Sequence, residues 1–123
     1  MNKKNLVFAI DFDGTIVEDK YPEIGKLRPG AKRVINKLYE KGHTIIIWTC
    51  RCNQNREILD KEIMIDFLLL NKIKYHKIND NPDCVYFGCY PKIYYNYIID
   101  DKQIGGLPNW EKINNILRGA GIL

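Results

Sequence analysis

Two aspartates stand two positions apart at the end of an apolar run near the start of the chain. Residues 6–10 contain no polar residue and lead directly into Asp11, Phe12, Asp13, Gly14 and Thr15. A run of this kind that stops at a glycine is typical of a buried β-strand ending in a turn. Side chains alternate along a strand, so both carboxylates are expected on one face, where a hard cation such as Mg²⁺ or a shared proton would relieve their repulsion. The alternative is a turn that uses Asp and Gly only for backbone reasons.

A second acidic pair follows another short apolar run. Residues 97–99 are Tyr-Ile-Ile, and Asp100 and Asp101 come directly after them. The carboxyl ends of parallel strands meet at one edge of a sheet, so two acidic strand ends can converge on a single cation. The sequence therefore predicts a cation site at this edge.

Elements between the two pairs are expected to build the sheet. Residues 31–39 have helical spacing of apolar positions, and residues 44–48 read as a second buried strand ending at Thr49 and Arg51. A strand-helix-strand order implies a right-handed parallel crossover, which brings Thr49 and Arg51 to the same edge as Asp11. Thr49 could bind a phosphate through its hydroxyl, and Arg51 through its fork of N–H donors. The alternative is that Thr49 is an ordinary β-forming residue and Arg51 a solvated surface charge.

The rest of the chain is expected to contain a hairpin, two helices and a short strand. Residues 16–30, with two prolines and two glycines, predict a short hairpin flap. Residues 55–71 predict a helix with an apolar stripe, and its additional apolar residues suggest burial on more than one side; the stripe comprises Leu59, Ile63, Phe67 and Leu70. Residues 74–78 are a weaker strand candidate, residues 79–91 receive no assignment, and residues 108–117 predict a last helix capped by Asn109.

Composition limits the class of protein. A chain of 123 residues that is 46% hydrophobic suits one domain over residues 1–123. The net charge is +4 without a basic run, so a nucleic-acid partner is possible but not favoured. The apolar start is too short for a signal peptide or a membrane span, which predicts a soluble cytoplasmic protein with no membrane partner.

The chain has four cysteines, enough for a zinc site or two disulfides. Cys50 and Cys52 form a CxC pair, and four residues separate Cys84 from Cys89. Neither spacing suits a structural zinc site, and a chain without an export signal is expected to keep its thiols reduced. Structural zinc is therefore disfavoured.

The order of these motifs resembles the haloacid dehalogenase-like (HAD) superfamily of phosphohydrolases over nearly the whole chain. DFDGT at residues 11–15 resembles its first motif, the apolar strand ending in Thr49 its second, Lys92 in PKIYYNYIIDD its third, and Asp100 with Asp101 its fourth. With the elements above, this predicts a three-layer, doubly wound, Rossmann-like α/β domain. Its mainly parallel sheet is expected in strand order 3-2-1-4.

The resemblance implies a role for each acidic residue. Asp11 would attack phosphorus to form an aspartyl-phosphate, and Asp13 would act as general acid and base. Mg²⁺ would be held by Asp11, by the backbone carbonyl of Asp13 and by Asp101, and Asp100 would contact the ligands of the ion or reach the ion through water. An acid at position 13 also resembles the phosphatases of the superfamily rather than members whose aspartyl-phosphate persists.

The other motif residues are expected to contact the substrate. Thr49 would bind phosphoryl oxygens, with Arg51, Gly14 and Thr15 as further substrate-binding residues. Lys92 would neutralise charge on Asp11 and on the transferred group. The alternative for Lys92 is a solvated surface lysine.

No cap domain fits between these motifs, so the chain resembles the capless branch of the superfamily. An open site needs another source of selectivity: a large phosphorylated substrate that covers it, or a neighbouring subunit of a homo-oligomer that acts as a lid. Tyr21, Tyr90, Tyr94 and Tyr95 are candidates for the rim, although tyrosines are often ordinary half-buried residues.

The sequence thus predicts a Mg²⁺-dependent phosphomonoester hydrolase whose substrate, small or macromolecular, is unassigned. A nucleic-acid end phosphatase is one alternative. A catalytically silent metal-binding regulatory module of the same fold is another.

Overall fold

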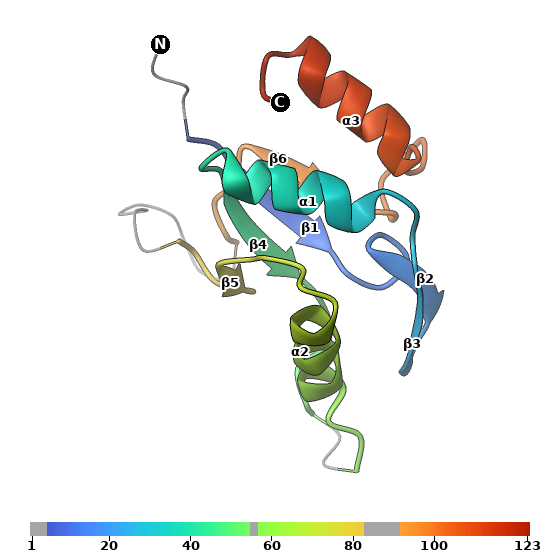
Figure 1. The fold of residues 1–123 in the computed structure, drawn as a ribbon. Coiled ribbons are helices and arrows are strands. Elements are labelled where there is room, and N and C mark those ends of the chain that lie inside the picture. Colours follow the sequence, from blue (N-terminus) through green and yellow to red (C-terminus); the bar gives the residue numbers. More distant parts are fainter. Residues whose placement is uncertain (1–4, 55–56, 83–91) are drawn as a thin grey trace.

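A four-stranded parallel sheet forms the centre of the computed structural model, which describes residues 5–54, 57–82 and 92–123 (Figure 1). Its strands are β1 (Val7–Asp11), β4 (Thr44–Trp48), β5 (Lys77–Ile78) and β6 (Tyr97–Ile99), in the order β5-β4-β1-β6. β1 pairs with both β4 and β6, because its continuous apolar residues can be buried on both faces. The ends of β1, β4 and β6 therefore lie at one edge of the sheet.

Helices α1 and α3 cover one face of this sheet. α1 (Ala31–Glu40) lies across β1 and β4, and α3 (Trp110–Gly119) packs beside α1 (Figure 1). The side chain of Asn109 accepts a hydrogen bond from the N–H of Lys112 at 2.8 Å, which confirms the predicted cap of α3. The apolar positions predicted for the first helix are buried: Ala31, Val34, Ile35 and Leu38.

The predicted flap is a two-stranded antiparallel hairpin. It consists of β2 (Val17–Lys20) and β3 (Glu23–Leu27), with Tyr21 and Pro22 at its tip. In Figure 1 the hairpin lies beyond the carboxyl end of β1, next to α2. The hairpin is thus placed to form one wall of any site at that edge.

The second helix, α2 (Asp60–Leu70), is shorter than predicted and differently rotated. Residues 57–59 are not helical, because Asn53 caps the helix from outside: its Oδ1 accepts the N–H of Lys61 at 2.8 Å, and its own N–H donates to Asp60 Oδ1 at 2.8 Å. The predicted stripe is wrong at Leu59, Ile63 and Leu70, which are exposed, whereas Phe67 is partly buried against the core. The buried positions of α2 are Asp60, Met64 and Leu68. Burial of α2 on more than one side is therefore wrong as well.

Two apolar clusters divide the core between the faces of the sheet. All three helices contribute to the larger one, which contains Phe8 and Ile10 of β1, whereas Val7 and Ala9 face a smaller cluster with Ile93. The domain is a mixed α/β structure with a Rossmann-like parallel sheet. The doubly wound arrangement, in which helices cover both faces of the sheet, stays a prediction.

Candidate functional site

An open hollow of about 670 Å³ lies at the carboxyl edge of the sheet. The ends of β1, β4 and β6 and the tip of the hairpin contribute to it. Its lining residues are Asp11, Asp13, Asp19, Tyr21, Trp48, Thr49, Cys50, Asp100, Asp101 and Lys102. The two predicted acidic pairs and Thr49 therefore meet in one place, although nearly 90 positions separate the pairs in the chain.

The acidic residues converge closely enough to share a cation. Asp11, Asp100 and Asp101 each offer a carboxylate oxygen, and these oxygens lie within 4.8 Å of one another. Thr15 fixes this arrangement, because its Oγ1 donates to Asp11 Oδ2 at 2.9 Å and accepts the N–H of Asp101 at 3.0 Å. Carboxylate oxygens are ligands that hard divalent cations accept, so these three could share one cation.

The structure gives Gly14 and Thr15 a supporting role in place of the predicted substrate contacts. Thr15 is fully buried and its hydroxyl is occupied by Asp11 and Asp101. The turn is anchored by Trp110 Nε1, which donates to the Thr15 carbonyl at 2.9 Å, and by Arg28, which donates to the Gly14 carbonyl at 3.1 Å. The Thr15 hydroxyl proton and the Gly14 N–H, which donates to the Val17 carbonyl at 2.8 Å, are therefore both used within the protein.

Gly14 also has a steric reason to lack a side chain, which gives a testable prediction. Its φ is +86°, and a Cβ there would collide with the carboxylate of Asp101. Gly42 is the matched control, since its φ is +90° but nothing lies within 4 Å of its Cβ position. Both alanine variants are expected to lose about 1–2 kcal/mol of unfolding free energy to backbone strain. Only Gly14→Ala should also weaken Mg²⁺ binding, measured by titration calorimetry; equal affinities in the two variants would contradict this placement of Asp101.

The convergence of carboxylates changes the protonation of the site. The pKa of Asp11 is raised to about 8, chiefly by burial and then by the hydrogen bond with Asp101 and the negative charges of Asp100 and Asp101, against a lowering contribution from Thr15. Without a cation, a proton therefore stays in this cluster at neutral pH. A divalent cation would replace that proton.

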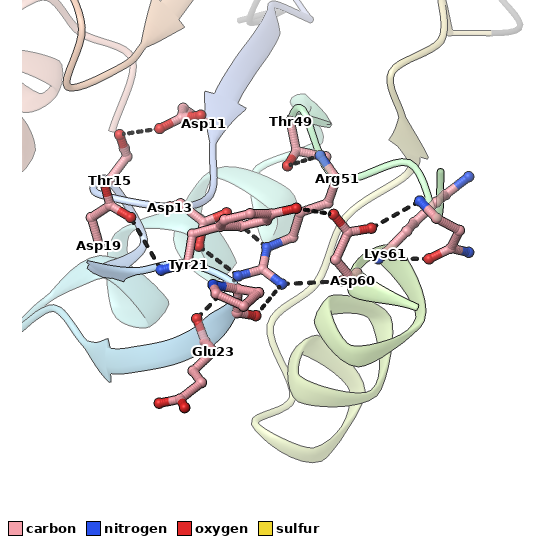
Figure 2. Close-up of polar contacts among 12 residues, drawn as sticks. Asp11, Asp13, Thr15, Asp19, Tyr21, Glu23, Thr49, Arg51, Asp60 and Lys61 are labelled. Carbon is pink, nitrogen blue, oxygen red and sulfur yellow. Dashed lines mark hydrogen bonds and ion pairs between the residues drawn. The ribbon is translucent and has the colours of Figure 1, made fainter. Parts of the chain in front are cut away.

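Arg51 is the largest departure from the predicted site. It is fully buried and forms a bidentate ion pair with Asp13, in which Nε donates to Oδ2 at 2.7 Å and Nη2 donates to Oδ1 at 2.8 Å (Figure 2). Its remaining N–H groups donate to the carbonyls of Pro22, Asp60 and Glu23 at 3.1–3.2 Å. All five guanidinium donors are used within the protein, so Arg51 has none left for a phosphate and its predicted role is wrong. Instead, Arg51 joins the hairpin, α2 and Asp13.

Asp13 is consequently not a free carboxylate in this structure. Both of its oxygens accept hydrogen bonds from Arg51, and only 18% of its side chain is exposed. It nevertheless lines the hollow beside Asp11. Each oxygen accepts one bond from Arg51, so acceptor sites remain on Asp13 toward the hollow.

Tyr21 and Asp60 complete the network around Arg51. The Tyr21 hydroxyl donates to Asp60 Oδ2 at 2.6 Å, and the centroid of its ring lies 4.9 Å from Cζ of Arg51 (Figure 2). Burial acts to raise the pKa of Asp60, but hydrogen bonds from Tyr21, Asn53 and Lys61 and the charge of Arg51 outweigh it and lower the pKa. Asp60 is thus held as a carboxylate, and the helical pattern of residues 55–71 gave no sign of this role.

Thr49 lies where the sequence predicts. Asn79 holds its backbone on both sides, accepting the Thr49 N–H at 2.8 Å and donating to the Thr49 carbonyl at 2.7 Å. Thr49 Oγ1 accepts the N–H of Arg51 at 3.1 Å, so its hydroxyl proton can still be donated to another group. Asn79 was missed; its position after the weak strand at residues 74–78 is the only sequence signal.

The predicted lysine is not at the hollow. Lys92 is exposed, and its Nζ lies 4.5 Å from the centroid of the Tyr95 ring. Among the described residues, the cation that lines the hollow is Lys102, which follows the second acidic pair directly. The structure therefore does not place Lys92 where it could neutralise Asp11.

The remaining predicted features are settled only in part. Cys50 and Cys52 are exposed free thiols, while Cys84, Cys89 and Tyr90 lie outside the described residues. No helix within residues 5–54, 57–82 and 92–123 is long and apolar enough to cross a bilayer. The cytoplasmic location stays a prediction.

Comparison with known proteins gives a structural relative without a stated activity. No family model matches the chain, and no curated protein matches it. A solved structure, described as that of a conserved protein from Bacteroides thetaiotaomicron, is similar with a TM-score of 0.81 and 29% sequence identity. The similarity covers 95% of this chain and 93% of that one, so the two share the α/β fold over essentially their whole length.

Proposed function

We propose that this protein is a Mg²⁺-dependent phosphomonoester hydrolase of the capless HAD type that works through an aspartyl-phosphate on Asp11. The observation that carries the proposal is the convergence of Asp11, Asp100 and Asp101 beside Thr49 in one open hollow. The parallel sheet, with β1 between β4 and β6, supports the same assignment.

The donor set fits a magnesium ion. Asp11 and Asp101 would hold it with the backbone carbonyl of Asp13, and Asp100 would assist directly or through water. The raised pKa of Asp11 supports this, because three close carboxylates need a proton or a cation between them. When bound, the ion supplies positive charge that offsets repulsion between an anionic nucleophile and an anionic ester.

The chain's own residues would carry out two displacements. In the first, an Asp11 oxygen attacks phosphorus, the bond from phosphorus to the leaving oxygen breaks, and Asp13 protonates that oxygen. In the second, water attacks phosphorus, gives its proton to Asp13, and the bond between phosphorus and Asp11 breaks. Thr49 and Lys102 line the hollow and would bind the phosphoryl oxygens.

The proposal is tested with p-nitrophenyl phosphate and a panel of phosphorylated metabolites, peptides and oligonucleotides. Release of phosphate that needs Mg²⁺ and stops with EDTA is expected for at least one class. No release from any class, with Mg²⁺ binding intact, would favour the catalytically silent module. One observation favours that second candidate: Arg51 occupies both oxygens of Asp13.

The role of Asp13 gives a prediction about leaving groups. Asp13→Asn should lower kcat about 10²- to 10⁴-fold on alkyl phosphates and much less on p-nitrophenyl phosphate, whose leaving group needs little protonation. The ratio of the two rates on one preparation is the measurement, because it does not depend on the fraction of folded protein. An equal loss on both substrates would exclude the acid role.

Magnesium binding is expected to depend on pH. Below pH about 8 the metal-free cluster holds a proton on Asp11, and binding must release it. Affinity should therefore rise with pH by up to about tenfold per unit, and level off above about pH 8. Calorimetry in two buffers with different ionisation enthalpies measures the released proton, and a buffer-independent heat at pH 7 would contradict the raised pKa.

A further inference from the structure

The aromatic ring of Tyr21 is held in place at the rim of the candidate active site. It lies at the tip of the β2–β3 hairpin and is 55% exposed, yet its hydroxyl donates to Asp60 at 2.6 Å and its N–H donates to Asp19 at 3.3 Å. Asp60 itself is only 6% exposed. An exposed tyrosine usually samples several rotamers, whereas this one is tied to a buried group.

Arg51 supports the same ring from the other side. Its Cζ lies 4.9 Å from the Tyr21 ring centroid, and the guanidinium is immobilised by five hydrogen bonds (Figure 2). The ring is thus fixed by its hydroxyl and by its contact with a cation, and it still contributes to the wall of the hollow. A ring that is already ordered loses little conformational entropy when a flat group stacks on it.

The rest of the wall suits a phosphorylated compound that has a flat ring. Trp48, half-buried at the end of β4, lines the same hollow, and Lys102 adds an exposed cation. The volume of about 670 Å³ is within the range of about 300–1,000 Å³ found for small-molecule sites. Aromatic side chains beside a phosphate-binding region are the means by which proteins hold bases without reading their sequence.

We propose that Tyr21 is a stacking platform for the base of a nucleoside monophosphate whose phosphate is presented to Asp11. The inference rests on the proposed hydrolase function and adds its substrate class. Tyr21 determines specificity, because its ring stacks on the base. The tether to Asp60 and the contact with Arg51 hold that ring in position.

The test compares two substrates with the same leaving oxygen, adenosine 5′-monophosphate and ribose 5-phosphate, which lacks the base. Wild type should prefer the nucleotide by about 5- to 150-fold in kcat/KM, as expected for one stacked base. Tyr21→Leu should remove most of that preference, chiefly through KM. Tyr21→Phe keeps the ring and should retain most of it. Tyr97→Leu is the control: Tyr97 is an exposed tyrosine that does not line the hollow, and its substitution should leave the ratio unchanged.

A binding measurement separates failure of the platform from failure of the hydrolase. Calorimetric titration of adenosine 5′-monophosphate and ribose 5-phosphate into Asp11→Asn reports stacking without turnover. Tighter binding of the nucleotide that is lost in Asp11→Asn/Tyr21→Leu supports the platform even if no phosphate is ever released, which would refute only the hydrolase. Hydrolysis of both substrates with the same ratio in wild type and Tyr21→Leu overturns the platform and leaves the hydrolase standing.

Two further substrates show whether the stacked base belongs to a free nucleotide or to the end of a nucleic-acid strand. A 5′-phosphorylated oligothymidylate that shows the same dependence on Tyr21 supports the platform and assigns it to strand ends. Dependence on Tyr21 for the mononucleotide alone supports a free nucleotide. A phosphotyrosine peptide that depends on Tyr21 while the nucleotide and the sugar phosphate do not differ overturns the proposal.

Discussion

Asp11→Asn should lower phosphate release by at least about 10³-fold, the loss expected when a covalent nucleophile is removed. The amide is nearly the same size as the carboxylate, so the hollow should be preserved. The measurement is a steady-state assay with saturating Mg²⁺, with the chosen substrate at several concentrations. Asp66→Asn, an exposed carboxylate on α2, is the matched control and should keep the wild-type rate. Retained activity in Asp11→Asn would rule out the nucleophile assignment.

The same substitution should stabilise the metal-free protein. The pKa of Asp11 is raised to about 8 in the folded chain against 3.8 ordinarily, so between these pH values the unfolded chain ionises this group more readily than the folded one. This group's contribution to stability is complete below pH about 4 and is lost as the pH rises toward 8. Asn has no proton to lose, so at pH 7 with EDTA we expect a gain of roughly 1 kcal/mol or more after allowance for solvent screening. A thermal melt measures it, and an unchanged or lower Tm would contradict the raised pKa.

Arg51→Met should be the most destabilising substitution among those proposed. It removes the buried cation that pairs with the half-buried carboxylate of Asp13 and leaves the carbonyls of Pro22, Glu23 and Asp60 without their donors. Breaking a buried pair on one side costs about 3–5 kcal/mol. Urea denaturation followed by circular dichroism measures the loss.

Two variants test whether the cost comes from the geometry of Arg51 or from its charge. Arg51→Lys keeps the charge but replaces a planar fork of five donors by three, so it should lose nearly as much. Arg33→Met removes an exposed pair with Glu111, 3.3 Å long, and should cost less than about 1 kcal/mol. A similar small cost for Arg51→Met would mean that the network is not what holds the hairpin to α2.

Local patterns were enough to find the elements that supply the candidate catalytic groups. The strands at β1, β4 and β6, the hairpin and the cap at Asn109 follow from apolar runs, turn residues and cap preferences, which act over a few positions. Parallel pairing then follows from the connections. The meeting of Asp11 with Asp101 could therefore be predicted.

Other features depended on contacts between distant segments. The side of α2 that faces the core is set by the hairpin and by Arg51, because α2 is apolar around most of its circumference and its own pattern does not choose a face. Arg51 follows a strand end as a phosphate-binding residue would, and only its five acceptors, drawn from three separate segments, show it to be internal.

The sequence by itself determined which residue types stand at the strand ends, because strand and turn preferences are local. Tertiary structure decided which of them face the hollow. Lys102 lines the hollow whereas Lys92 does not, and Tyr21 is fixed by Asp60, since a side chain's partners depend on how the chain packs rather than on its neighbours in sequence.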